Sequence, residues 1–570
     1  MKGYEKESFL APLFKMLEAT FELIVPLVVA NIMDIGIKNQ DNAYIWHQCV
    51  IMVLLGVIGL VCALTAQYFS AKAAMGFSTA LRKEMFAHIS KLSYRELDQL
   101  GTPTLVTRIT NDVNQAQTGV NMVLRLFLRS PFIVVGAVIM SFTIDWKIGL
   151  IFLIAVPLIS VVIYAIMRTT VPIYKKAQSS LDRISLITRE NHVGARVVRA
   201  FGRQQEEYKE FSQVNDDYTK VQVTAGKISA LLNPATTVIM NFAIIGILWY
   251  GSKEVSIGTL TQGEVVALVN YMNQILIALI ALANLIVAVT KAMASGMRLN
   301  EVLDTQPSLT DEGSSTQQEK AKADRVAFED VSFTYAGSKE PALSHISFTA
   351  KPGETIGIIG GTGCGKSTLV NLIPRFYDAS EGSVVINGNN AKEYPFSQLR
   401  KKVGMVPQQA VLFKGTIRDN MKWGKEDATE EEIQRALSIA QASDFVNSKP
   451  EGLNTMVSQG GANLSGGQRQ RLTIARALVG DPEILIMDDS ASALDFATDA
   501  ALRHAIHQQT KGMTVFIVSQ RATSIKQADK ILVLDDGELV GVGTHKELME
   551  SCEVYREICL SQLSEQEVNR

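Results

Sequence analysis

Two segments of the chain contain residue types that could bind a nucleoside triphosphate and hydrolyse it. The first is Gly360-Gly361-Thr362-Gly363-Cys364-Gly365-Lys366-Ser367-Thr368, which contains the pattern G-x-x-x-x-G-K-[ST]. It follows an apolar run at 355–359 and opens a predicted helix, so its backbone amides should surround phosphates. Lys366 should reach the β and γ oxygens, and the Ser367 hydroxyl should bind Mg²⁺. Taken alone, the segment could also be an ordinary glycine-rich turn.

The second segment runs from Leu464 to Asp495 and contains a further phosphate-binding pattern and two carboxylates. Its first five residues place a glycine-rich backbone at the N-terminus of a predicted helix, where free amides and the helix dipole attract phosphate. The apolar run 484–487 predicts a buried parallel strand that ends at Asp488 and Asp489. Carboxylates at that edge hold Mg²⁺ and activate water in α/β ATPases. Asp495, which ends the segment, is counted with the nucleotide-binding residues.

The string Leu464-Ser465-Gly466-Gly467-Gln468 is the signature of the ATP-binding cassette (ABC) transporters, and the chain resembles the exporters of that family over its whole length. The resemblance implies that Tyr335 stacks on adenine and that Gln408 senses Mg²⁺ and the γ-phosphate. Without it, Tyr335 would be an ordinary strand aromatic and Gln408 a surface glutamine. The implied cofactors are ATP and Mg²⁺, with Ser367, Gln408 and Asp488 at the metal.

The composition predicts a multi-domain protein with a membrane part. The chain has 570 residues, 47% of them hydrophobic, and six apolar runs are long enough to cross about 30 Å of hydrocarbon. We predict an all-α six-helix transmembrane domain at 1–303 with the type I ABC exporter fold, a polar linker at 304–325, and an α/β P-loop nucleotide-binding domain at 326–570. The predicted spans are 13–37, 48–69, 122–143, 148–168, 231–251 and 264–290.

Charge indicates the orientation of these spans. Lys and Arg are concentrated in the long segments 70–121 and 168–230, which predicts that these loops and both termini are cytoplasmic. The resemblance to exporters implies the plasma membrane of a bacterial cell. The formal net charge of -2 argues against a nucleic-acid partner. The five cysteines show no metal or disulfide spacing. The N-terminus lacks signal-peptide features, so the first helix is expected to remain as an anchor.

The tips of the two long loops lie near 100–104 and 193–202. The resemblance implies short coupling helices there, docked on nucleotide-binding domains, whereas the residues alone would favour ordinary turns. Several polar residues fall inside the spans, where ionisable groups are costly and usually face a cavity or a partner helix. They are Glu18, Glu22, Arg125, Arg129, Asn270, Asn273, Gln274 and Asn284. An interfacial position is the alternative for Glu18 and the two arginines. Met240, Met272 and Phe242 could line a pliable apolar site, although packing is the commoner role.

Three positions depart from the family's hydrolytic pattern. Asp489 stands where the family has the Glu that polarises water, Gln520 where it has a switch His, and Gln459 where exporters commonly have Glu. Aspartate is one methylene shorter, which withdraws its carboxylate by about 1.5 Å. Glutamine can hydrogen-bond a γ-phosphate but cannot carry the proton of an imidazole. Asp489, Gln520 and Gln408 are therefore the predicted catalytic positions of a slow, degenerate site.

These features resemble the degenerate-site subunit of bacterial heterodimeric multidrug exporters. The resemblance implies ATP-driven efflux of small amphiphilic molecules, in contact with membrane lipid and with a second half-transporter whose competent site uses this chain's intact signature. The alternatives are a homodimeric exporter of peptide or lipid, and an ATP-gated channel or regulator. A soluble ATPase of the chromosome-maintenance or translation type shares the signature but not the six apolar runs.

Overall fold

The computed structural model describes residues 3–311, 313, 324–490, 493–510 and 512–562. These form two compact units, one of residues 1–90 and 103–304 and the other of residues 91–102 and 305–570. The short segment 91–102 therefore belongs with the second unit, although it lies inside the sequence of the first. Most of the predicted linker, residues 312 and 314–323, falls outside the described residues.

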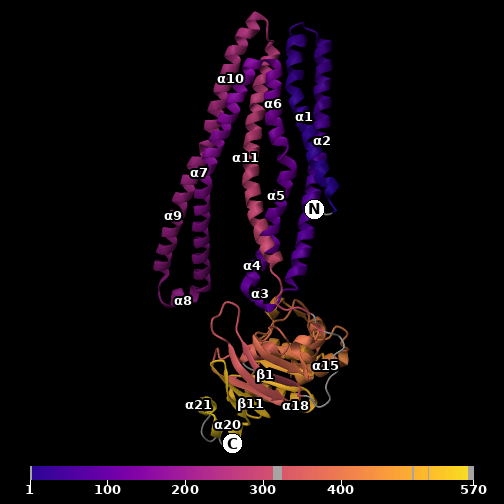
Figure 1. The fold of residues 1–570 in the computed structure, drawn as a ribbon, viewed down its shortest axis with the longest axis vertical. Helices are drawn as coiled ribbons and strands as arrows, with labels where there is room; N and C mark the ends of the chain where they lie inside the picture. The colour runs from indigo at the N-terminus through magenta and orange to yellow at the C-terminus, as the bar shows by residue number, and fades with distance from the viewer. Residues whose placement is uncertain (1–2, 312, 314–323, 491–492, 511, 563–570) are drawn as a thin grey trace. The chain divides into compact units, whose positions relative to one another are not determined.

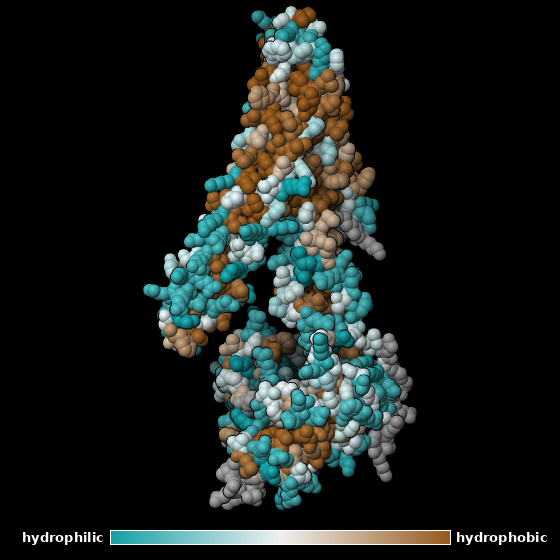
Figure 2. All heavy atoms as spheres, turned by 60° about the vertical axis from the view of Figure 1, so that its left-hand side comes forward, coloured by the Kyte–Doolittle hydropathy of each residue, from teal (hydrophilic) through white to brown (hydrophobic). Residues whose placement is uncertain are grey.

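The first unit is built from long helices, six of which are apolar and long enough to cross a membrane. They are formed by α1 (Glu5–Asn31) with η1 (Ile32–Ile37), α2 (Asn42–Ile89), α4 (Thr102–Thr107) to α6 (Arg129–Ile144), α7 (Trp146–Val193), α9 (Gln204–Ala230) with α10 (Leu232–Ile257), and α11 (Gln262–Asp304). Between α4 and α6 lie η2 (Arg108–Asp112) and α5 (Val113–Leu126), and α8 (Ala195–Ala200) separates α7 from α9. The apolar side chains of this unit form a continuous brown surface in its middle part (Figure 2). That surface is the one that lipid would contact.

The helices run well beyond the predicted spans. With 48 residues each, α2 and α7 are about 72 Å long, which agrees with the predicted extension of the membrane helices. The predicted span 122–143 is not one continuous helix: α5 ends at Leu126 and α6 begins at Arg129. Pro131 follows in the first turn of α6, where its missing N–H donor is tolerated.

The second unit is an α/β domain with two main sheets. A four-stranded antiparallel sheet has the order β2-β1-β4-β5, with β1 (Val326–Phe333), β2 (Leu343–Ala350), β4 (Glu381–Ile386) and β5 (Asn389–Asn390). A six-stranded sheet has the order β12-β11-β3-β10-β9-β6, with only β12 (Glu538–Gly543) antiparallel. Its parallel strands are β3 (Thr355–Gly360), β6 (Val403–Val406), β9 (Ile484–Asp488), β10 (Thr514–Val518) and β11 (Lys530–Asp535). Because β9 and β10 are buried along their whole length, they read as continuous apolar runs.

The parallel sheet brings the chemistry-bearing segments to one edge. The phosphate loop follows β3, Gln408 follows β6, Asp488 ends β9, and Gln520 follows β10. The carboxyl ends of parallel strands meet at the same edge, which is where open α/β sheets bind ligands.

In the first unit, η2 is joined to α11 by the buried carboxylate of Asp112, directly before α5. Asp112 accepts hydrogen bonds from Ser295 Oγ at 3.0 Å, from Arg298 Nε at 3.0 Å and from Arg108 Nη1 at 3.0 Å. The Asp112 side chain is only 5% exposed, so its charge depends on these donors. Removing it would leave two guanidinium groups without their carboxylate.

We therefore expect Asp112→Ala to lower the free energy of unfolding of the detergent-purified protein by roughly 2–3 kcal/mol. This is less than the loss expected for a fully buried ion pair, because the Arg298 side chain is 41% exposed. Thermal unfolding measures this. Asp217→Ala is the control, because Asp217 pairs with Lys220 at the surface and its loss should have little effect. Equal destabilisation by the two variants would contradict the role of Asp112.

Candidate active site

A cavity of about 400 Å³ in the second unit is lined by both of the segments that the sequence singles out. Most of the predicted site residues meet on its walls. They are Tyr335, Thr362, Gly363, Gly365, Lys366, Ser367, Thr368, Gln408, Asp488, Asp489 and Gln520, joined by Ala342, Val518 and Ser519.

The phosphate loop connects β3 to α12 (Lys366–Leu372), as the sequence predicts. Gly365 precedes this helix with a φ of +93°, and a Cβ there would lie 2.6 Å from the carbonyl oxygen of Ala342, so only glycine fits. Lys366 is buried and donates from Nζ to the carbonyl oxygen of Gly360 at 3.0 Å. Its ammonium is therefore held inside the loop, where it adds positive charge to the amides at the helix N-terminus.

Ser367 and Asp488 provide oxygen ligands suited to Mg²⁺. The Ser367 hydroxyl donates to Asp488 Oδ1 at 3.0 Å, and Asp488 is 6% exposed. Burial raises the pKa of the Asp488 carboxyl, and the hydrogen bond from Ser367 partly opposes this. Among the described residues, no group of three or more His, Cys, Asp or Glu side chains could hold a metal ion. A hydroxyl and one carboxylate, completed by phosphate oxygens and water, are the set that Mg²⁺ takes beside a triphosphate, where it neutralises phosphate charge.

Asp489 begins the segment after β9 with a φ of +43°, a backbone conformation that Asp tolerates better than most residues. Its N–H donates to the carbonyl oxygen of Val518 at 3.0 Å, which places the Asp489 backbone beside the end of β10. Burial raises the pKa of the Asp489 carboxyl, opposed by the positive charges of Arg521 and Lys366. Its carboxylate is therefore a stronger base than an exposed aspartate, on a side chain shorter than glutamate.

Tyr335 lies two residues beyond the end of β1, and its hydroxyl is 2.9 Å from Thr368 Oγ1. Its ring packs edge-on against Phe333, at 4.8 Å between centroids, and against Tyr377, at 5.5 Å. Tyr335 thus lies at the nucleotide cavity, with its ring supported by two other aromatic residues.

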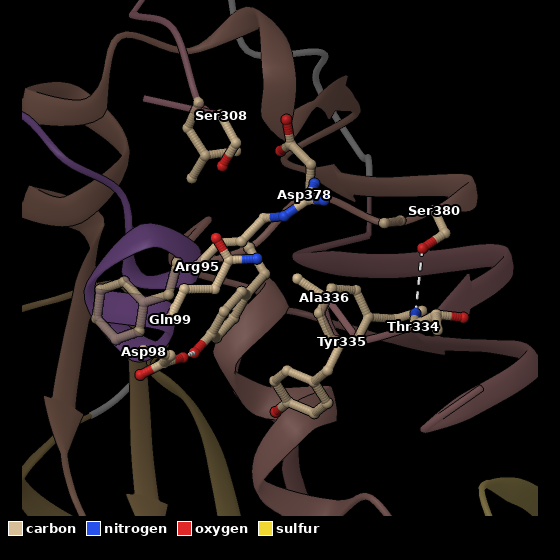
Figure 3. Close-up of a pocket in the computed structure, with 14 residues that line it drawn as sticks. Arg95, Asp98, Gln99, Ser308, Thr334, Tyr335, Ala336, Asp378 and Ser380 are labelled. Atoms are coloured by element: carbon tan, nitrogen blue, oxygen red, sulfur yellow. Dashed lines mark hydrogen bonds between the residues drawn. The ribbon is translucent and has the colours of Figure 1, made fainter. Parts of the chain in front are cut away.

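Tyr335 also lines a second cavity of about 400 Å³ (Figure 3). Residues of α3 (Tyr94–Leu100) line it, among them Asp98, which accepts a hydrogen bond from the Tyr377 hydroxyl at 2.6 Å. Burial, with the help of Asp98, raises the pKa of Tyr377. The Tyr94 ring lies 4.6 Å from that of Phe376. The sequence analysis missed this contact, although two aromatics directly after the phosphate-loop helix are a detectable signal.

Several predicted nucleotide-binding residues do not line the cavity. Gly360, Gly361 and Cys364 support the loop: a Cβ at Gly360 would lie 2.0 Å from the Leu534 carbonyl oxygen, and Cys364 is buried. The signature residues, 464–468, are at the start of α17 (Gly466–Leu478), where Ser465 and Gln468 form a reciprocal cap. Asp495 caps α18 (Phe496–Gln509). One chain therefore offers its two phosphate-binding helix ends at separate places.

Comparisons with known proteins agree with this geometry. Residues 8–279 match the family model of the ABC transporter transmembrane region, and residues 343–492 match that of the ABC transporter. The chain is similar to uncharacterized ABC transporter ATP-binding proteins of Bacillus subtilis, with 37% identity over 99% of this chain and 97% of the relative, and of Mycobacterium tuberculosis, with 36% identity over the same shares.

Two further comparisons extend these matches. An ATP-dependent lipid A-core flippase of Desulfotalea psychrophila is 35% identical over 82% of this chain and 81% of the relative. The solved structure of a bacterial Atm1-family ABC exporter with ATP bound superposes with a TM-score of 0.81 at 24% identity, covering 99% of both chains. This last likeness establishes the fold, which is the exporter fold that the sequence predicts.

The raised pKa of Asp489 leads to a prediction about stability. A carboxyl whose pKa is higher in the folded state destabilises the fold when ionised, and this cost disappears as the pH falls through the raised pKa. We expect Asp489→Asn to raise the unfolding temperature of the nucleotide-free protein at pH 7, and the difference from the unaltered chain to shrink towards pH 4. Calorimetry across this range measures it.

Asp495→Asn is the matched control, because hydrogen bonds from Thr498 at the start of α18 lower the pKa of Asp495. Its ionised form is stabilising, so the substitution should not raise the unfolding temperature. An equal rise in both variants, or none for Asp489→Asn, would contradict the assignment of Asp489 as a desolvated carboxylate.

Proposed function

The chain belongs to the ABC transporter family and is an ABC exporter with its transmembrane and nucleotide-binding parts fused, and from this premise we propose that it is the degenerate-site half of a heterodimeric exporter of small amphiphilic molecules. It is a multi-pass membrane protein, and ABC exporters act as dimers that hydrolyse ATP. In the proposed cycle, ATP binding closes the two nucleotide-binding domains and turns the membrane helices outward. Hydrolysis at the partner's site then resets them. ATP must bind the closed state better than the open one.

The observation that carries the proposal is the composition of the cavity. The residues that hold phosphate and Mg²⁺, Lys366, Ser367 and Asp488, are all present, whereas the two hydrolytic positions hold Asp489 and Gln520. Loss of a well-placed general base costs about 10²- to 10⁴-fold in rate. ATP should therefore bind here and turn over slowly.

The intact signature supports the partner's role. In this family each ATP lies between the phosphate loop of one domain and the signature of the other. The Ser465–Gln468 cap fixes the backbone at the start of α17, and residues 465–468 do not line this chain's own cavity. We infer that they complete a competent site on a second chain that supplies Glu and His.

Two short elements are the proposed coupling helices. Helix α3 groups with the nucleotide-binding unit and contacts it through the Asp98–Tyr377 hydrogen bond and the Tyr94–Phe376 pair. Helix α8 lies between Val193 and Phe201, whose side chains are 81% and 77% exposed. These apolar residues at the predicted cytoplasmic tip suit a contact with the nucleotide-binding domain of the partner.

The substrate proposal is supported by charges inside the helical unit. Lys15 and Glu18 pair at 2.6 Å, and Arg129 pairs with Glu22 at 2.8 Å. Arg125 buries its Nε without a hydrogen-bond partner in the described part of the chain. Such groups within apolar helices suit a ligand with a polar head and an apolar body. Met272 is fully buried and packs in the core of this unit.

A lipid is the second candidate substrate, in a homodimer or a heterodimer. It is favoured by the similarity to a protein named as a lipid A-core flippase. An ATP-gated channel has no such support, and substrate accumulation against a gradient would distinguish a pump from it.

The positive charges of the two long loops support cytoplasmic termini.

The test is steady-state ATPase activity in lipid, with the chain alone and with the half-transporter encoded beside it. We expect the chain alone to be nearly inactive and the pair to be active. Asp489→Glu combined with Gln520→His should raise the ATPase activity of the chain alone at least tenfold, because it restores the glutamate base and the switch histidine of the family.

Asp481→Glu is the matched control, since Asp481 has a similar φ of +47° but does not line the cavity. It should leave the activity unchanged. Ordinary substrate-stimulated turnover by the unaltered chain alone would show that Asp489 is an adequate base, and the asymmetric mechanism would be wrong.

A further inference from the structure

The segment that carries Gln520 is held by a residue from the end of the described chain. We define the switch loop as residues 519–522, which run from the end of β10 to the first residue of α19 (Ala522–Ile525). Gln562 Nε2 donates to the carbonyl oxygen of Gln520 at 2.7 Å, and Gln562 Oε1 accepts from the N–H of Ala522 at 2.9 Å. A single carboxamide thus bridges the loop on both sides of Arg521.

The remaining hydrogen bonds of the switch-loop backbone are local or come from the sheet. The N–H of Ser519 donates to the carbonyl oxygen of Ile358 at 3.1 Å, which continues the pairing of β10 with β3. The N–H of Arg521 donates to Ser519 Oγ at 2.9 Å. Around α19, the N–H groups of Ser524 and Lys526 donate to the carbonyl oxygens of Arg521 and Ala522 at 3.1 and 3.0 Å. In the described part of the chain, Gln562 is thus the residue from outside the loop that joins position 520 to position 522.

Gln562 is the last described residue of α21 (Glu553–Gln562), which lies with α20 (His545–Ser551) near the end of the chain (Figure 1). Tyr555 and Cys559 of α21 are fully buried, and the Tyr555 hydroxyl lies 2.8 Å from His545 Nδ1. Positions 555, 559 and 562 are spaced by four and three residues, so they share one face of the helix. The face that anchors α21 in the core therefore also directs Gln562 towards the switch loop.

The Gln520 side chain depends on this support. Gln520 is exposed at the nucleotide cavity. Its carboxamide makes no hydrogen bond with the described residues, and its bond with Gln562 uses the main-chain oxygen. No side-chain partner aims it, so its direction follows from the backbone of the switch loop. A displacement of that backbone would move the carboxamide away from a γ-phosphate by a similar distance.

We propose that Gln562 is a positioning residue: it holds the switch loop so that the Gln520 carboxamide can hydrogen-bond the γ-phosphate of ATP in the cavity. This inference rests on the γ-phosphate role proposed for Gln520. Helix α21 thereby links the C-terminal part of the chain to recognition of ATP over ADP, which lacks the γ-phosphate.

The test uses the full chain in lipid nanodiscs and has two measurements. Hydrogen–deuterium exchange of peptides covering 519–525 reports on the loop, and dissociation constants for Mg·ATP and Mg·ADP report on the site. Because one neutral hydrogen bond changes an equilibrium by about three- to tenfold, Gln562→Ala should speed exchange by about that factor. It should weaken Mg·ATP binding by a similar factor and leave Mg·ADP binding unchanged.

Two variants sharpen the result. Gln562→Glu has similar size and helix propensity and keeps an acceptor for Ala522, but it presents a carboxylate to the Gln520 carbonyl oxygen. Gln562→Glu should also weaken the binding of Mg·ATP and leave the binding of Mg·ADP unchanged. Ser561→Ala removes a hydroxyl that bonds only the Ile558 carbonyl oxygen within α21, and it should change neither measurement.

The outcomes separate the two ideas. Unchanged hydrogen–deuterium exchange in Gln562→Ala would overturn the positioning role. So would faster exchange in Gln562→Ala with an unchanged preference for ATP, if Gln520→Ala loses that preference. If Gln520→Ala keeps the full preference for ATP, the γ-phosphate role of Gln520 is wrong, and the proposal for Gln562 in ATP recognition falls with it. Equal weakening of Mg·ATP and Mg·ADP by Gln562→Ala would indicate a folding defect and would also overturn the proposal.

Discussion

The central constraint on the nucleotide-binding unit is the placement of two adjacent carboxylates, the buried Asp488 and the half-buried Asp489, at the carboxyl edge of its parallel sheet. Burial raises the pKa of both groups, and the charge of Asp489 raises that of Asp488 further. Such an arrangement is unfavourable without compensating charge. Lys366 and Ser367 supply part of the compensation, and a divalent cation beside a bound triphosphate would supply more. The site is therefore built for its ligand at a cost to the stability of the nucleotide-free domain.

The same edge of the sheet connects the ligand to other parts of the second unit. Tyr335 is supported by Tyr377, and Tyr377 is hydrogen-bonded to Asp98 of α3. On the other side, the switch loop is bridged by Gln562 of α21. Elements from residues 94–100 and 553–562 thus reach the two flanks of a cavity formed by residues 335–520.

The sequence predicted the strand–loop–helix around Lys366, the buried strand before Asp488 and the six long apolar helices, because each depends on local pattern and spacing. Asp488 could be assigned to the site because it ends a predicted buried parallel strand, whereas Gln408 and Gln520 were assigned only through the resemblance to exporters of the family. The resemblance implied a docked helix near 100–104, but the particular hydrogen bonds of Asp98 and Gln562 were not predicted, since they join residues far apart in the chain and have no characteristic spacing. The break before Arg129 was also missed, because the apolar pattern continues through it.

The measurement that tests the asymmetric mechanism most directly is the ATPase activity of the assembled transporter with one substitution at a time in this chain. Lys366→Ala disables its own phosphate loop. Gly466→Glu places a carboxylate where the signature meets phosphate, and a Cβ at Gly466 meets nothing within 4 Å, so the fold should tolerate it. We predict that Gly466→Glu abolishes most of the activity, whereas Lys366→Ala retains a substantial part. Equal loss in both variants, or greater loss with Lys366→Ala, would contradict the division of labour between the two ATP sites.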